Sequence, residues 1–359
     1  MTAQLVDWDF AATTTRSLVK GGPSLTLSEA KAVVAELREL SQQAEAHVRN
    51  YTGLSAPEAA PVAVVDRPGW AQSNIDGFQV ILTPLLQRIA ERRKREPGPL
   101  TAAVGSRIAG AEVGTILAYL ASRVLGQYEI FLPPGAGNGR LTLVAPNIVA
   151  TERMLEVDPH DFRLWVCLHE ETHRTQFTAV PWLRAHVQSE IEAYLHVTDV
   201  DPAVVWKRLR ATTGAVADAV LGRESGLSLL EAVQSPEQRA VLDRVTALMS
   251  LLEGHADVVM DEVGPGVIPS VAEIRRKFNR RRQGSGPVDR AIRRLLGIDL
   301  KMQQYAEGAR FVRAVVGEVG VAGFNTVWHS PATLPTLTEL RDPDAWLARV
   351  LNHRRALPA

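Results

Sequence analysis

The sequence has little cysteine and no excess of charge of either sign. Its single cysteine, Cys167, excludes an internal disulfide framework and any zinc ribbon built from several cysteines. Lysine plus arginine and aspartate plus glutamate number 40 each, so the chain lacks the basic surplus with which nucleic-acid binders neutralise phosphates. We therefore expect no nucleic-acid partner, and we expect Cys167 to be a buried core thiol. The basic cluster Arg275–Arg282 is interpreted as a solvated or acid-paired face.

Long apolar runs are also missing. The most apolar segment, Ala102–Leu125, is interrupted by Arg107, Glu112 and Arg123. Its charge-free part, Val113–Ser122, is too short to span a bilayer. The first residues, MTAQLVDWDF, carry two acids and no basic flank before an apolar stretch, unlike a secretory signal. We expect a cytoplasmic protein without a membrane partner.

Many segments instead place apolar residues at helical spacing, and few show the alternation of strands. Helices are predicted over residues 27–51, 72–94, 102–125, 158–177 and 237–262. Pro84 should kink or divide the second of them. Two short β-rich runs, Tyr128–Leu132 and Leu141–Val144, flank a glycine-rich connection and predict a hairpin. The sequence thus predicts a mainly α protein with a small β-hairpin or sheet, which is an α+β fold.

The helix predicted from Asp158 onward contains the pattern H-E-x-x-H, formed by His169, Glu170 and His173. Histidines at positions i and i+4 lie one turn apart on one face, so both imidazoles can reach a single metal ion. Zinc accepts such nitrogens and can keep one position open for water. Glu170 could take a proton from the metal-bound water and return it to a leaving group. The alternative is a histidine pair on a solvated helix face.

The helix predicted over residues 237–262 is apolar on most sides and has one polar stripe. The stripe consists of Thr246, Ser250, Glu253 and Asp257. Buried carboxylates are costly unless they are paired or bound to a metal, so Glu253 is the natural third ligand. Asp257, one turn further on, can accept the free N–H of a ligating histidine. The alternative is an amphipathic helix with a solvated polar edge.

These motifs carry a family resemblance. H-E-x-x-H followed by E-x-x-x-D on a later helix resembles the gluzincin branch of zinc metallopeptidases. The segments PNIVATE (Pro146–Glu152), DFRLWVCLHEETHRTQFTAVPWL (Asp161–Leu183) and LEGHADVVMD (Leu252–Asp261) resemble an actinobacterial-type family of uncharacterised zincin-like metalloproteases. Some members of that family are labelled as associated with deazaflavin-coenzyme biosynthesis. The likeness extends to VDWDF near the N-terminus and to FNTVW and LPTLTELRDPDAW near the C-terminus.

The resemblance implies a mostly helical zincin-like fold with one zinc ion per chain. It makes His169, His173 and Glu253 the ligands, Glu170 the base, and Asp257 the partner of a ligating histidine. It brings no substrate with it. We expect a helical region over residues 1–100, a zincin-like catalytic core over 101–265 and a second helical region over 266–359, packed as one compact unit.

Other residues could play supporting roles. A donor that stabilises the transition state is expected, with Tyr305 favoured because Gln304 and Lys301 could join it at one face. The further candidates for this donor are His186, Tyr194, His196 and His329. Glu171 is interpreted as a surface residue or a support of the site, and His255 as facing away from it.

The segment Leu141–Asn147 is predicted to lie along the cleft, where an edge strand could hold an extended substrate. The alternative is a structural hairpin that covers the core.

The sequence favours a zinc-dependent hydrolase, foremost a metallopeptidase acting on a peptide. Two alternatives stay open: a zinc-stabilised scaffold or partner-binding protein, and a hydrolase of a small amide-bearing metabolite. The presence of Glu170 favours catalysis, because a structural site needs only ligands and usually closes with a fourth. The sequence leaves the oligomeric state open.

Overall fold

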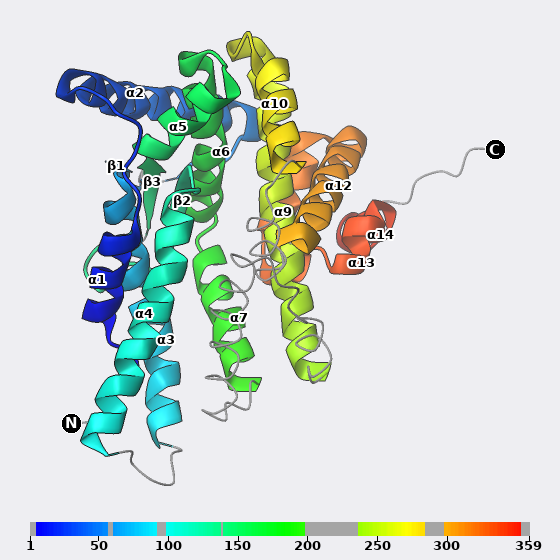
Figure 1. Cartoon of the computed structure of the whole chain (residues 1–359). Coiled ribbons are helices and arrows are strands. Elements are labelled where there is room, and N and C mark those ends of the chain that lie inside the picture. Colours follow the sequence, from blue (N-terminus) through cyan, green and yellow to red (C-terminus); the bar gives the residue numbers. More distant parts are fainter. Residues whose placement is uncertain are drawn as a thin grey trace. The chain divides into compact units, whose positions relative to one another are not determined.

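The computed structural model describes residues 5–56, 60–91, 98–137, 139–197, 236–283 and 298–352. They form two compact units. Unit 1 takes the described residues of Met1–Ser41 and Ala60–Val166, and unit 2 takes those of Gln42–Ala59, Cys167–Asp199 and Ala215–Ala359. The architecture is mainly helical with one three-stranded sheet, so the predicted α+β class is confirmed (Figure 1).

The helices described in unit 1 are α1 (Trp8–Leu18), α3 (Arg67–Glu91), α4 (Pro99–Ala121) and α5 (Ala145–Leu155). Two helices contribute to both units, α2 (Leu27–Thr52) and α6 (Pro159–Ala179). The helices described in unit 2 are α7 (Leu183–Val197), α9 (Pro236–Val267), α10 (Val271–Gln283), α12 (Ile298–Phe324), α13 (Leu337–Arg341) and α14 (Pro343–Leu351). Short 3-10 turns at Asn325–Trp328 and Pro331–Thr333 lead into α13.

The helix ends follow the sequence signals closely. The predicted helices at 27–51 and 237–262 correspond to α2 and α9 within a few residues. The predicted start of α6 at Asp158 is confirmed, because the helix begins at Pro159 and the Asp161 N–H donates to the Asp158 carboxylate at 2.9 Å, as in an N-cap. The division expected at Pro84 does not occur, since α3 continues through this residue.

The sheet has the strand order β1-β3-β2, with β1 at Val62–Val65, β2 at Gly126–Glu129 and β3 at Arg140–Val144. The antiparallel pairing of β2 with β3 confirms the predicted hairpin. Strand β1, however, pairs with β3 in parallel on its other side. The hypothesis that Leu141–Asn147 is an edge strand for substrate is therefore wrong, because β3 is hydrogen-bonded on both sides and α5 begins at Ala145. The structural interpretation of the hairpin holds.

The apolar helix α4 is explained by its packing against α1, beside which it lies in Figure 1. Two glycines allow the backbones to approach closely. A Cβ at Gly110 would lie 2.3 Å from Asp7 O, and one at Gly114 would lie 2.5 Å from Ala11 O. In the described part of the chain, no helix has the length and apolar character needed to cross a membrane.

In unit 2, α9 and α12 pack side by side (Figure 1). Their crossing again depends on glycine. A Cβ at Gly254 would lie 2.2 Å from Gly308 C, and one at Gly308 would lie 1.8 Å from Ser250 O. This close approach fixes the position of α9 within the unit.

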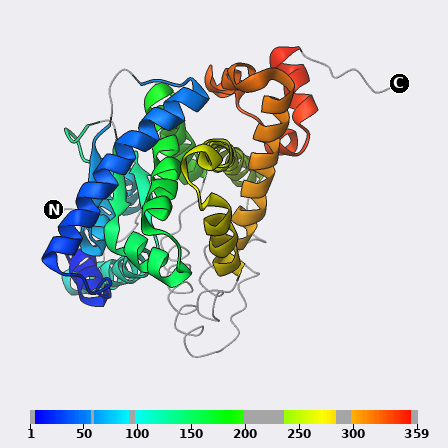
Figure 2. The same cartoon turned by 90° about the horizontal axis from the view of Figure 1, so that it is seen from above.

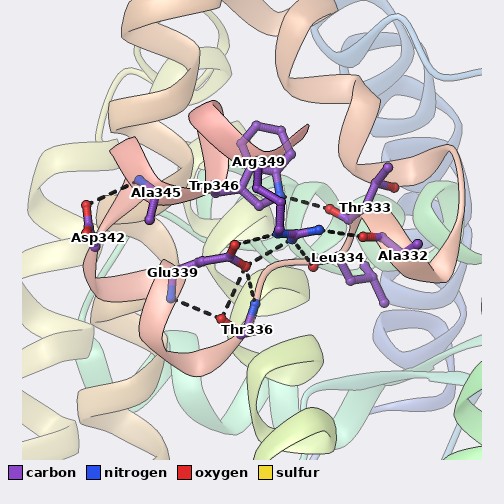
Figure 3. A network of polar contacts seen from close by, with 9 residues as sticks. All are labelled: Ala332, Thr333, Leu334, Thr336, Glu339, Asp342, Ala345, Trp346 and Arg349. Atoms are coloured by element: carbon purple, nitrogen blue, oxygen red, sulfur yellow. Dashed lines mark hydrogen bonds and ion pairs between the residues drawn. The ribbon is translucent and has the colours of Figure 1, made fainter. Parts of the chain in front are cut away.

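The C-terminal helices of unit 2 lie beside α12 (Figure 2) and are held by a polar network around Arg349 (Figure 3). The Arg349 guanidinium donates to the buried Glu339 carboxylate and to the carbonyl oxygens of Ala332 and Leu334. The Glu339 carboxylate also accepts the backbone N–H of Thr336, at 2.9 Å, as part of the capping box of α13. The network therefore joins the loop before α13 to both short helices.

Candidate metal centre

The first two candidate ligands lie on α6, in the part of this helix that belongs to unit 2. Cys167 and Leu168, immediately before the motif, are completely buried. The prediction that Cys167 is a core thiol is therefore confirmed. These buried residues anchor the helix, and the side chains of His169 and His173 emerge from it only partly covered.

The imidazoles of His169 and His173 direct the same atom towards one point. Their Nε2 atoms are 3.2 Å apart, and their rings are perpendicular. Glu253, on α9, approaches from the other helix, with its carboxylate oxygens 3.7 Å from His169 Nε2 and 3.6 Å from His173 Nε2. The structure thus brings together the three predicted ligands, all within unit 2.

The donor set and its spacing fit zinc. Ligand atoms bound about 2.0–2.1 Å from a tetrahedral zinc ion lie roughly 3.3 Å from one another, close to the separations of these nitrogen and oxygen atoms. Two imidazoles and a carboxylate are also ligand types that zinc accepts. Among the described residues, three ligands gather here, which would leave a fourth position open.

Gln176 determines which nitrogen of His173 is available to bind a metal. Its side-chain Nε2 lies 3.0 Å from Leu252 O, which can only accept a hydrogen bond, so the amide oxygen must be the atom facing His173 Nδ1 at 3.0 Å. His173 Nδ1 therefore donates its hydrogen to Gln176. The Nε2 atom of a neutral His173 then carries the lone pair that a metal requires.

Glu170 is almost completely buried beside the ligands. Burial raises the pKa of its carboxyl group to about 8, and the carboxylates of Glu253 and Glu171 push it in the same direction. In the absence of a cation, this carboxyl group holds a proton at neutral pH. A cation held by the nearby ligands would oppose these effects and favour the carboxylate.

Glu171 is not a surface residue, so that part of its interpretation is wrong. Its carboxylate is fully buried and accepts the Nε–H of Arg174 at 2.6 Å. Arg174 also pairs with Glu45, on α2, at 2.6 Å. Because both charges are largely removed from water, the pairing compensates their desolvation. Glu171 thus helps to hold α6 in unit 2.

The structure leaves the predicted histidine partner and two of the candidate transition-state donors untested. Asp257 follows Glu253 by one turn on α9 and is 36% exposed, with one oxygen 4.0 Å from Arg275 Nη2. Its role as partner of a ligating histidine stays a prediction. Tyr305 belongs to α12, but its side chain lies outside the described residues, as does that of His196.

Three more predictions concern residues away from the ligands. His186 packs its ring against Trp182, and His329 is exposed. Tyr194, on α7, is partly buried. Within the basic cluster on α10, Arg275 binds Asp261 at 2.8 Å and Lys277 binds Glu273 at 2.8 Å, while Arg276 and Arg280 are exposed.

The sequence interpretation missed the surroundings of His173. Gln176 is not among the predicted site residues, although a residue three positions after His173 lies on the same helix face. His255 is predicted to face away from the site, yet the Nδ1 atom of this buried histidine lies 3.0 Å from the Gln176 amide nitrogen. Burial lowers the pKa of His255 to about 3, and its nearness to His173 acts in the same direction.

A mainly helical α+β fold with the two histidines of H-E-x-x-H, a distant glutamate and a buried glutamate beside them has the features of the zincin-like class of proteins. The chain matches the family model of zincin-like metallopeptidases over residues 6–347, and it belongs to that family. It is also similar to a crystal structure from Chloroflexus aurantiacus, described as a "putative hydrolase with a novel fold". That similarity has 30% identity and a TM-score of 0.69, and it covers 97% of this chain and 100% of the other. Among curated proteins, none matches the chain.

Proposed function

We propose that the protein is a zinc-dependent hydrolase that cleaves peptide bonds, with His169, His173 and Glu253 as zinc ligands. The observation that carries this proposal is the convergence of their three ligand atoms within 4.8 Å of one another. Family membership supports the choice of zinc and of hydrolysis. Three protein ligands are typical of catalytic zinc, whereas structural sites are usually closed by four.

Zinc bound here would supply a Lewis acid that polarises the scissile carbonyl and acidifies water. The protein's own contribution to proton transfer comes from Glu170. Its carboxylate accepts a proton from the attacking water and returns that proton to the leaving amine. The burial of Glu170 suits this role, because a raised pKa brings a carboxyl group closer to the range in which it both accepts and donates protons at neutral pH.

A digest of a peptide library with zinc-loaded protein tests the proposal, with and without a chelator. Glu170→Gln preserves the shape of the side chain but cannot accept a proton. We expect this variant to keep its zinc and to lose about 10²–10⁴-fold in hydrolysis. Glu192→Gln, at an exposed glutamate on α7, is the matched control and should behave as the wild type.

Each failure of this experiment has a distinct meaning. Hydrolysis by Glu170→Gln at the wild-type rate would remove Glu170 from the reaction. Bound zinc without cleavage of any peptide, but with cleavage of small amides, would move the substrate to that class. Bound zinc without hydrolysis of either would favour a zinc-stabilised scaffold.

A further inference from the structure

We infer that Gln176 is a positioning residue, which orients His173 and ties the two helices that carry the ligands, and that His255 holds Gln176 in place. This inference rests on the proposed zinc site but not on the identity of the substrate. It concerns a chain of three side chains, His173, Gln176 and His255, whose hydrogen bonds all have a fixed direction.

The direction follows from Leu252 O, which can only accept. The Gln176 amide nitrogen donates to this oxygen at 3.0 Å and to His255 Nδ1 at 3.0 Å. Its amide oxygen is left to accept from His173 Nδ1 at 3.0 Å. All hydrogen-bonding atoms of this fully buried amide are therefore used, and none can change role without leaving a buried group unpaired.

This arrangement connects α6 to α9 at the level of the ligands. Gln176 lies three residues after His173 on α6, and its amide binds the backbone of Leu252, the residue before Glu253 on α9. The same side chain thus sets the ring orientation of one ligand and the position of the segment that carries another. A ligand held in this way loses less freedom when the metal binds.

His255 supplies the third anchor. Its ring packs against Phe324 at 5.3 Å and Trp328 at 5.6 Å between centroids, within the core of unit 2. Because its Nδ1 accepts a hydrogen bond, it is neutral and carries its proton on Nε2. A carboxylate in place of the Gln176 amide would direct an oxygen, which can only accept, at both Leu252 O and His255 Nδ1. Both of these atoms are acceptors as well. The amide is thus the group that satisfies both sides.

The test begins with the imidazole tautomer of His173 in the zinc-free protein, measured by ¹⁵N NMR of histidine-labelled samples. In the wild type, we expect the hydrogen on Nδ1. Gln176→Met keeps the length of the side chain and removes its hydrogen bonds, so His173 should show a mixture of tautomers. Gln176→Glu retains an oxygen that can accept from Nδ1–H and should retain the wild-type tautomer.

Zinc affinity is measured on the same proteins by competition with a chromophoric chelator. Gln176→Met should weaken binding about 10–100-fold, as is common for partners of metal ligands. His255→Phe keeps a ring in the core and removes one anchor of the amide, so its loss should be smaller. Gln188→Met, at an exposed residue of α7, should bind zinc as the wild type does.

A wild-type tautomer together with zinc affinity within about twofold of wild type in Gln176→Met would overturn the inference. If Gln176→Met fails to fold, the other two measurements decide. The hydrogen on Nε2 of His173 in the wild type, or an unchanged zinc affinity in His255→Phe, would then overturn the inference. Neither measurement uses hydrolysis, so an inactive protein with the expected tautomer and zinc losses would contradict the proposed activity alone.

Discussion

The crossing of α9 and α12 leaves no room for a side chain at Gly308, and an alanine there should disrupt it. The added Cβ would lie 1.8 Å from Ser250 O, whereas ordinary contacts begin near 3.4 Å. The clash involves a backbone oxygen and a methyl group fixed to the helix, so no rotamer change can relieve it. The two helices would have to separate by well over an ångström.

The magnitude follows from two opposing effects. Overpacking of a well-packed core costs typically about 1–3 kcal/mol and occasionally more. Alanine favours a helix interior over glycine by about 1 kcal/mol. A backbone clash of this depth belongs at the high end of the first range, so we expect Gly308→Ala to lower the free energy of unfolding by about 2 kcal/mol. Because α9 carries Glu253, zinc affinity should fall as well.

Denaturant unfolding followed by circular dichroism measures this change, and Gly317→Ala is the matched control. Gly317 lies on the same helix, is exposed and has nothing within 4 Å of an added Cβ. It should therefore gain about 0.5–1 kcal/mol from its helix propensity. If Gly308→Ala were stabilised as much as Gly317→Ala, the close crossing would be refuted.

Three further predictions concern single side chains. Glu253→Ala should abolish tight zinc binding and Asp257→Ala should weaken it about 10–100-fold, measured by chelator competition; the reverse order would exchange the two roles. Arg349→Ala leaves the buried Glu339 carboxylate without its main partner and should cost about 1–3 kcal/mol in denaturant unfolding, while Arg341→Ala, which breaks an exposed pair, should cost less than about 0.5 kcal/mol. His255 has a pKa of about 3 when folded, below its ordinary 6.5, so the unfolded chain binds more protons between these values and stability falls as the pH drops below 6.5. Between pH 7.5 and 5.5 with chelator present, wild type should lose about 1 kcal/mol more than His255→Phe, and equal losses would contradict a buried neutral histidine.

The parts of the fold that the sequence predicts are those set by local patterns. Apolar spacing and caps located α2, α3, α4, α6 and α9, and the Asp158 cap shows how a local hydrogen bond marks a helix start. Strand β1 was missed because its four residues, although rich in valine, form a short run between Pro61 and Pro68. Its pairing with β3 joins segments that are far apart in sequence, and this pairing is what makes β3 a central strand.

The same distinction applies to the site. The three ligands were predictable, since a helical histidine pair and a polar stripe on an apolar helix are both local features. The bridge from Gln176 to Leu252 and His255 was not, because it depends on how α6 meets α9. Likewise, Arg174 contacts Glu171 within α6, three positions away, but its pairing with Glu45 on α2 depends on how these two helices pack.

Metal stoichiometry tests the central claim most directly. Elemental analysis of the purified wild-type protein should find about one zinc ion per chain, because three ligands of suitable type converge at one point. His173→Ala removes one of them and should lose the metal, while Glu170→Gln should retain it. Stoichiometric zinc in His173→Ala, or none in the zinc-supplemented wild type, would contradict the site.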